Sequence, residues 1–173
     1  MRKSHNKRFS AAMTTLGLLV LAAPVSAQTV DLVGEQSGWS LYADKATPKA
    51  VCFLAAQPQS MDPPTAKRGP IFFYISAWPK DGIKTEPSVK AGYPIAPDKE
   101  MSVTIGPDTF KLFAKADRGF VSNPTEELKL IEAMKKGSTA VVKATSARGT
   151  STSDTYALGD FAPALQKLAE TCP

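Results

Sequence analysis

The sequence predicts a mainly β fold: a β-sandwich or barrel-like domain with two peripheral helices. Short runs of β-branched and aromatic residues recur along the chain and are separated by clusters of Gly, Pro, Ser and Asp. Apolar residues take the spacing of a helix in only two segments, 123–137 and 160–172. Strands in series with one or two helices are typical of sandwiches and barrels, so we expect one such domain over residues 28–173.

The first 27 residues have the composition of a signal peptide. A basic head is followed by a mostly apolar run over residues 11–23 and by Val25-Ser26-Ala27, which supplies the small residues that precede a cleavage site. We therefore expect cleavage after Ala27. The apolar run is shorter than the ~20 residues that a membrane span needs, so we expect an exported protein without a transmembrane segment after cleavage.

Three strands are predicted in the first half of the domain. The runs 39–43 and 50–54 are apolar and aromatic, and the second places Cys52 in the sheet. The run 71–75 is the most hydrophobic, which predicts a central strand with both faces buried. Residues 58–70 are rich in Pro, Ser and Lys and are expected to form an exposed loop.

The second half is predicted to contain five further strands and both helices. The strands are expected over residues 89–93, 101–105, 109–114, 139–145 and 151–158. Asn123 is a helix N-cap, with Glu126 at the capping-box position, and Gly137 follows the last turn of that helix. A second helix is expected to begin at Asp160 and to carry Cys172 at its end.

The small number of cysteines and histidines limits which redox, metal and catalytic sites the protein is able to form. Cys52 and Cys172 are too far apart for a CxxC redox motif and too few for a zinc site, so in an oxidising compartment we expect a structural disulfide. Its loop closure would contribute about 4–5 kcal/mol by the chain-entropy model. The only histidine, His5, lies in the predicted signal peptide, which excludes Ser-His-Asp and Cys-His catalysis in the exported part. We expect no metal and no cofactor.

The net charge gives no support for nucleic-acid binding. The whole chain carries 21 Lys and Arg against 16 Asp and Glu, a net charge of +5. Four of those 21 basic residues and no acidic residue lie in the predicted signal peptide, so 17 basic and 16 acidic residues remain, a net charge of +1. Nucleic-acid binding needs a basic face, so we expect no nucleic-acid partner.

One polar cluster near the C-terminus invites two interpretations. It comprises Arg148, Gly149 and Thr150 in a turn, with Asp154 and Tyr156 in the following strand. As an interaction site, Arg148 would bind an anion or a carboxylate of a partner. As a structural cluster, Gly149 would supply an unusual turn, Arg148 would pair with Asp154, and Tyr156 would pack in the sheet. The structural interpretation is preferred, because Arg–Asp pairs often fix loops.

Aromatic residues of the most hydrophobic run also allow two interpretations. They would form either a ligand platform or part of the core, and in so apolar a run the core is preferred. They are Phe72, Phe73, Tyr74 and Trp78.

The ends of the first helix are expected to be structural. Lys135 and Lys136 complement the helix dipole at its C-terminus, in preference to a membrane or glycan contact. Glu126 and Glu127 are not expected to form a catalytic pair, because adjacent helical side chains diverge.

Short segments follow one another along the chain in a recognisable order. They are Trp39, Val51-Cys52-Phe53, Arg68-Gly69-Pro70, 72–75, Ala91-Gly92-Tyr93-Pro94, 133–137, 146–150 and 154–159, followed by the last helix. In this order they resemble the invasion-associated locus B (IalB) family of alphaproteobacterial exported proteins. Many members of the family carry a cysteine shortly after the first Trp, where this chain has Tyr42. The resemblance therefore favours pairing of Cys52 with Cys172.

The resemblance implies an exported, non-enzymatic, virulence-associated protein that takes part in host-cell interaction or invasion. It transfers no catalytic residue. A periplasmic envelope-maintenance or structural binding protein is the alternative, and an enzyme that uses carboxylates or a Ser-Lys pair is the second. We expect a monomer in the periplasm, on the cell surface or secreted, with an envelope protein or a host surface protein as its partner. Because loops carry function more often than core strands, Pro58 to Lys67 is the expected partner-binding element.

Overall fold

The computed structural model of this chain describes residues 29–64 and 67–173, so the predicted signal peptide lies outside the described residues. Eleven strands form one antiparallel sheet in the order β1-β2-β3-β5-β6-β9-β8-β7-β10-β11-β4. The strands are β1 (Val30–Gln36), β2 (Trp39–Asp44), β3 (Cys52–Ala56), β4 (Ser60–Asp62), β5 (Phe72–Trp78), β6 (Ile83–Lys90), β7 (Met101–Ile105), β8 (Asp108–Lys115), β9 (Arg118–Val121), β10 (Thr139–Thr145) and β11 (Ser151–Ala157). The helices are α1 (Pro124–Lys136), α2 (Phe161–Thr171) and the 3₁₀ turn η1 (Pro79–Asp81). None of the helices in these described ranges is long and apolar enough to cross a membrane.

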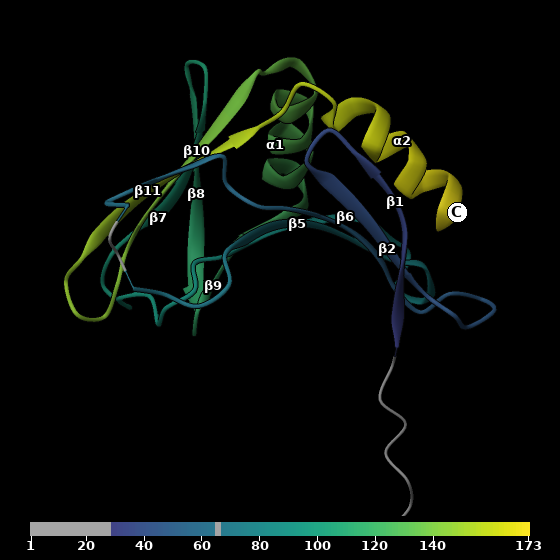
Figure 1. Cartoon of the computed structure of the whole chain (residues 1–173), viewed down its shortest axis with the longest axis horizontal. Helices are drawn as coiled ribbons and strands as arrows, with labels where there is room; N and C mark the ends of the chain where they lie inside the picture. The colour runs from purple at the N-terminus through teal and green to yellow at the C-terminus, as the bar shows by residue number, and fades with distance from the viewer. Residues whose placement is uncertain (1–28, 65–66) are drawn as a thin grey trace, which may run out of the picture.

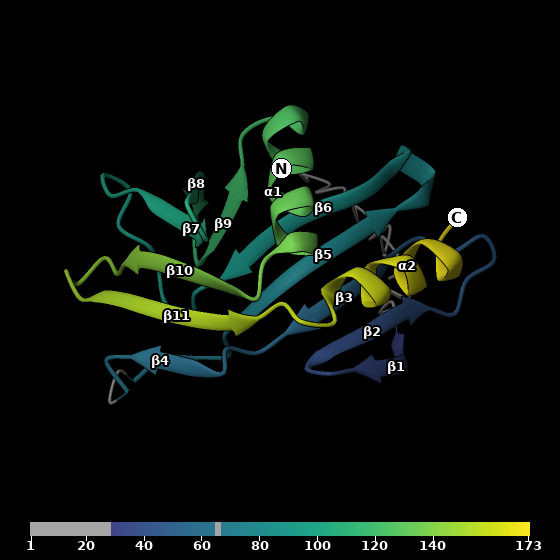
Figure 2. The same ribbon diagram turned by 90° about the horizontal axis from the view of Figure 1, so that it is seen from above.

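The sheet curls so that strands near its two edges meet. Figure 1 shows both helices on the same side of the sheet, and Figure 2 shows α2 lying along β2 and β3. The indole Nε1 of Trp39 in β2 donates a hydrogen bond of 3.2 Å to the carbonyl of Ala157 at the end of β11. The mainly β fold with two helices is confirmed, and the sheet is one continuous, barrel-like sheet.

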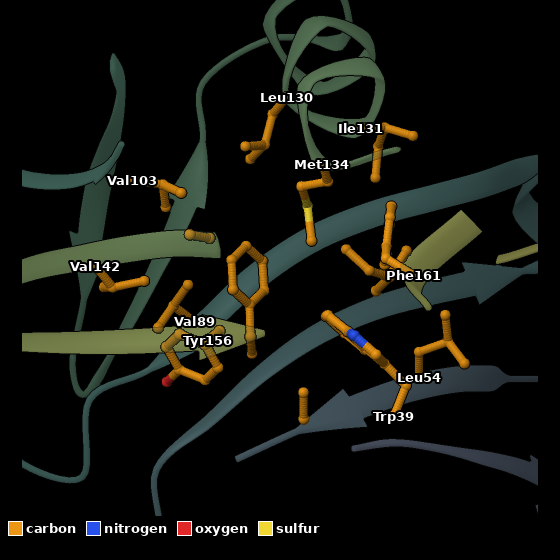
Figure 3. Packing of buried hydrophobic residues seen from close by; sticks show 14 of the residues in the cluster. Trp39, Leu54, Val89, Val103, Leu130, Ile131, Met134, Val142, Tyr156 and Phe161 are labelled. Carbon is orange, nitrogen blue, oxygen red and sulfur yellow. The ribbon is translucent and has the colours of Figure 1, made fainter. Parts of the chain in front are cut away.

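Aromatic side chains form the centre of the core, between the curled sheet and the helices (Figure 3). The ring of Trp39 lies 5.1 Å from that of Phe161 in α2 and 6.2 Å from that of Phe73 in β5. Phe73 in turn meets Tyr156 of β11 edge-on at 5.5 Å. These rings and Met134 of α1 are almost fully buried, and burial of such large apolar groups is the dominant favourable contribution to folding.

Local sequence signals set the limits of α1. Oδ1 of Asn123 accepts a hydrogen bond of 3.0 Å from the backbone N–H of Glu126, as an N-cap should. The side chain of Glu126 pairs with Lys129 instead of completing the predicted capping box. Gly137 ends the helix with φ of −81°, and a Cβ at this position would lie 2.5 Å from Cγ2 of Ile105. Glycine is therefore needed here for close packing on β7.

Some strands and one burial prediction differ from the expectation. The sequence does not predict β1, β4 or β9, and it places the strand before Gly92 too late, since β6 ends at Lys90. All seven residues of β1 are exposed and β4 has only three residues, so neither shows the half-buried alternation of a typical strand. The prediction that both faces of β5 are buried is wrong. Phe72, Tyr74 and Trp78 point outward and are only half-buried, because both helices cover the other face.

The Cys52–Cys172 disulfide joins β3 to the end of α2. Its Cα atoms lie 6.1 Å apart, and the two residues are separated by 120 positions in the chain. The bond holds the C-terminal helix against the strand that Leu54 and its neighbours contribute to the core. A disulfide of this kind fits a protein that folds outside the cytoplasm.

Candidate functional site

The carboxylate of Asp154 is held by Arg68 and not by Arg148. Nη1 of Arg68 donates to Oδ2 of Asp154 at 2.8 Å, and Nη2 donates to the other carboxylate oxygen, so the pair is bidentate. Asp154 lies on the inner face of β11, whereas Arg148 is exposed in the turn that precedes that strand. The predicted Arg148–Asp154 pair is wrong for this reason.

The Arg68–Asp154 pair connects two parts of the chain that are distant in sequence. Both side chains are only 3% exposed, and the guanidinium of Arg68 also lies 5.9 Å from the centre of the Tyr93 ring. The pair therefore ties the segment before β5 to β11 and packs against the segment after β6. Removing one member of such a pair would leave an unpaired charge in the interior.

The turn between β10 and β11 is held by its own hydrogen bonds. The N–H of Ser146 donates to the carbonyl of Thr150 at 2.8 Å, and the N–H of Thr150 donates to Oγ of Ser146 at 3.1 Å. Gly149 has φ of +87°, in the left-handed region that favours glycine. This conformation leaves Arg148 at the tip of the turn, with its side chain exposed to solvent.

A pocket of about 180 Å³ lies beside this turn. It is lined by Lys67, Tyr93, Ser146, Arg148, Thr150 and Thr152. The hydroxyls of Tyr93 and Thr152 lie 2.6 Å apart and are buried. Burial raises the pKa of Tyr93 above its ordinary value of 10.0. A tyrosine hydroxyl is protonated at neutral pH even without such a shift, and it is able to donate a hydrogen bond. The pocket thus has neutral hydroxyl groups on its inner side and two cations at its rim.

The charges of the pocket favour an anionic ligand. Lys67 and Arg148 are both exposed, and within residues 29–64 and 67–173 neither forms an ion pair with an acidic side chain. All the lining residues are basic, hydroxylated or aromatic. A guanidinium and an ammonium that share one opening are suited to binding a carboxylate or a phosphate by charge-assisted hydrogen bonds.

Of the other predicted site residues, Thr150 lines the pocket, whereas Tyr156 is fully buried in the core. The loop from Pro58 to Lys67 contains β4, and of its described residues only Lys67 lines this pocket. Lys135 is paired with Glu132 on the surface of α1. In the described ranges, no group of three or more His, Cys, Asp or Glu side chains is placed to hold a metal ion.

Reasoning from the sequence misses Arg68 and Tyr93, and it includes Lys67 only as the last residue of the expected partner-binding loop. These three residues meet the β10–β11 hairpin because the sheet curls, and no local spacing connects them with Arg148. Arg68 and Tyr93 do occur in the short segments that carry the family resemblance. Those segments were the only available signal.

Comparisons with known proteins agree with the resemblance. The family described as "Invasion associated locus B (IalB) protein" matches residues 39–169. No curated protein matches this chain in sequence. Among solved structures, the crystal structure of invasion associated protein B from Bartonella henselae has the same fold, with a TM-score of 0.55 and 16% sequence identity over 82% of this chain and 96% of that chain. This chain therefore belongs to the invasion associated locus B family.

Proposed function

We propose that this protein is an exported, non-enzymatic binding protein that recognises an acidic group of its partner through the Lys67–Arg148 pocket. The observation that carries the proposal is the pair of exposed cations at one opening, with hydroxyl groups beneath them. The buried Arg68–Asp154 pair and the hydrogen-bonded turn hold this opening in place before a partner binds. A preformed site loses less conformational entropy when it binds.

The family name suggests the biological setting. A protein of the invasion associated locus B family with a disulfide and a predicted signal peptide is suited to a place outside the cytoplasm, and at the cell surface it would be able to contact other cells. In our proposal the partner is a protein that presents a carboxylate, and the binding event serves host-cell contact.

The experiment is a crosslinking pull-down of the tagged full-length protein from live cells, with and without host cells. Wild type is compared with Arg148→Ala and Lys67→Ala. Lys143→Ala is the matched control, because it removes one positive charge from an exposed position of the same hairpin that does not line the pocket. We expect a host surface protein that is recovered by wild type and Lys143→Ala and lost from both pocket variants.

Other results would contradict the proposal. Recovery of envelope proteins alone would indicate envelope maintenance in place of host contact. Equal recovery of the host surface protein by wild type and all three variants would show that the pocket is not part of the interface. A hydrolase or transferase activity that copurifies with the exported protein would refute its non-enzymatic character.

A further inference from the structure

A second hollow lies on the outer face of the sheet, over β2, β3 and β5. We propose that it binds a neutral carbohydrate, with sugar rings packed on the side chains of Tyr42 and Phe72. The site is independent of the Lys67–Arg148 pocket, because that pocket lies at the β10–β11 hairpin and its Thr152 belongs to the inner face. Either site can therefore fail its test without affecting the other.

The hollow exists because a small residue lies among large ones. Ala55 of β3 pairs with Ser40 of β2 and with Tyr74 of β5, and these side chains share the outer face. Around this small side chain, Tyr42 and Phe72 rise on two sides. The resulting volume of about 450 Å³ lies within the range of ~300–1,000 Å³ that is usual for small-molecule sites.

The aromatic walls are held in position by their neighbours. The ring of Tyr42 stacks on that of Phe53 at 5.1 Å with an interplanar angle of 18°. Phe53 meets Tyr74 at 5.9 Å, and Tyr74 meets Phe72 at 5.4 Å. These rings are half-buried, so part of each is in contact with the sheet and part is available to a ligand. Rings fixed in this way cost little entropy when a ligand packs on them.

Hydrogen-bonding groups lie beside the aromatic walls. Glu35, Ser40 and Gln57 line the same hollow, and Oγ of Ser40 donates to Oε1 of Glu35 at 3.3 Å. Together they offer a hydroxyl, a carboxylate and an amide, which are the donors and acceptors that sugar hydroxyls require.

The combination of groups distinguishes a sugar from other occupants. A sugar ring presents C–H groups on its faces, which pack on aromatic rings, and hydroxyls on its rim. Among the described residues, Glu35 is the only charged one that lines the hollow, so an anionic ligand would be repelled. An apolar peptide would cover Glu35 and Gln57 without satisfying their hydrogen bonds, at a cost in free energy. A neutral carbohydrate has neither disadvantage.

The test is a titration of the exported protein with candidate ligands. Calorimetry measures the binding, and the NMR signals of the aromatic rings locate it. The probes are cellohexaose and chitohexaose, with the apolar peptide acetyl-Leu-Leu-Leu-amide as the alternative occupant. We expect at least one oligosaccharide to bind and to shift the ring signals of Tyr42 and Phe72 in the wild-type protein. Tyr42→Ala and Phe72→Ala should each weaken binding by about threefold to tenfold, the effect of losing one aromatic contact.

Two further variants separate binding from folding. Ala55→Val adds two methyl groups to the floor and favours the strand conformation, so it should abolish oligosaccharide binding while the protein stays folded. Phe113→Ala removes an exposed ring from the outer face that does not line the hollow, and it should leave binding unchanged. Binding of neither oligosaccharide, undiminished binding by Ala55→Val, or binding of the apolar peptide alone would overturn the proposal. The ring signals of the wild-type protein decide the matter even if a variant fails to fold.

Discussion

At the scale of single residues, two polar side chains on the inner face of β11 are satisfied to different degrees. Asp154 accepts two hydrogen bonds from Arg68, whereas the hydroxyl of Tyr156, two residues further on, finds no hydrogen-bond partner among the described residues. The first side chain is therefore expected to stabilise the fold through its partner. The second is expected to stabilise it mainly through the contacts of its ring.

Breaking the buried pair should destabilise the protein more than removing the exposed arginine. Asp154→Asn or Arg68→Met leaves one buried group without its partner, and we expect each to lower the free energy of unfolding by about 3–5 kcal/mol. Arg148→Ala should change it by less than about 0.5 kcal/mol, because the side chain is exposed and forms no ion pair with any described residue. Urea unfolding measures all three. If Arg148→Ala lowered the free energy of unfolding as much as Asp154→Asn does, that result would instead support a pair between Arg148 and Asp154.

Tyr156→Phe should change the response of stability to alkaline pH. Burial, followed by the nearby charge of Asp154, raises the pKa of Tyr156 above its ordinary value of 10.0. The folded state then keeps a proton that the unfolded state loses, so stability is complete below about pH 10 and falls as the pH rises further. The variant should show a smaller fall, and at neutral pH a free energy of unfolding equal to wild type or higher by about 1 kcal/mol. Unfolding curves from pH 7 to pH 11 measure both effects, and an unchanged alkaline fall would contradict the account.

At the scale of elements, prediction from sequence succeeds where the signal is local. The start of α1 at Asn123 and the strand β7 follow from residues adjacent in the chain. β1 lies at an edge with every residue exposed, so no apolar alternation marks it. The burial of β5 is also not predictable from local sequence. Its hydrophobic residues indicate a strand, but they do not indicate which of its faces the helices cover.

Gly137→Ala should disturb the junction between α1 and β7. A Cβ at this position would lie 2.5 Å from Cγ2 of Ile105, so the helix end or the strand must shift. We expect a loss of about 1–3 kcal/mol, the usual cost of overpacking. Gly159→Ala is the matched control, because nothing lies within 4 Å of a Cβ there. Equal thermal stability of the two variants would show that the junction tolerates the added methyl group.

The disulfide is expected to stabilise the attachment of α2. Replacing both Cys52 and Cys172 with Ala removes a cross-link between residues 120 positions apart, which the chain-entropy model values at about 4–5 kcal/mol. Urea unfolding with and without reductant should show this loss in wild type when reduced, and no further effect of reductant on the double variant. Equal stability of the wild-type protein with and without reductant would contradict this stabilising contribution of the disulfide.

At the scale of the whole molecule, the candidate site is a product of the curl of the sheet. Lys67, Tyr93 and Arg148 come from three connections that are distant in sequence, and they line one pocket because the buried Arg68–Asp154 pair brings their segments together. The sequence identifies Arg148 as a candidate for binding an anion and the loop that ends at Lys67 as the expected partner-binding element, but it does not predict that the two meet or that Tyr93 lies beside them. Long-range contacts of this kind leave no periodic signal, which is why the fold class is predictable here and the site is predictable only in part.

The most direct test of the central claim is an NMR titration of the exported protein with the acidic peptide acetyl-Gly-Glu-Gly-amide. The same peptide with Gln in place of Glu is the control. We predict that the acidic peptide alone shifts the side-chain signal of Arg148 and the backbone signals of Thr150 and Thr152, and that Lys67→Ala weakens the effect. Equal shifts with both peptides, or shifts confined to residues outside the pocket, would contradict the assignment of this pocket as the site that recognises a partner's carboxylate.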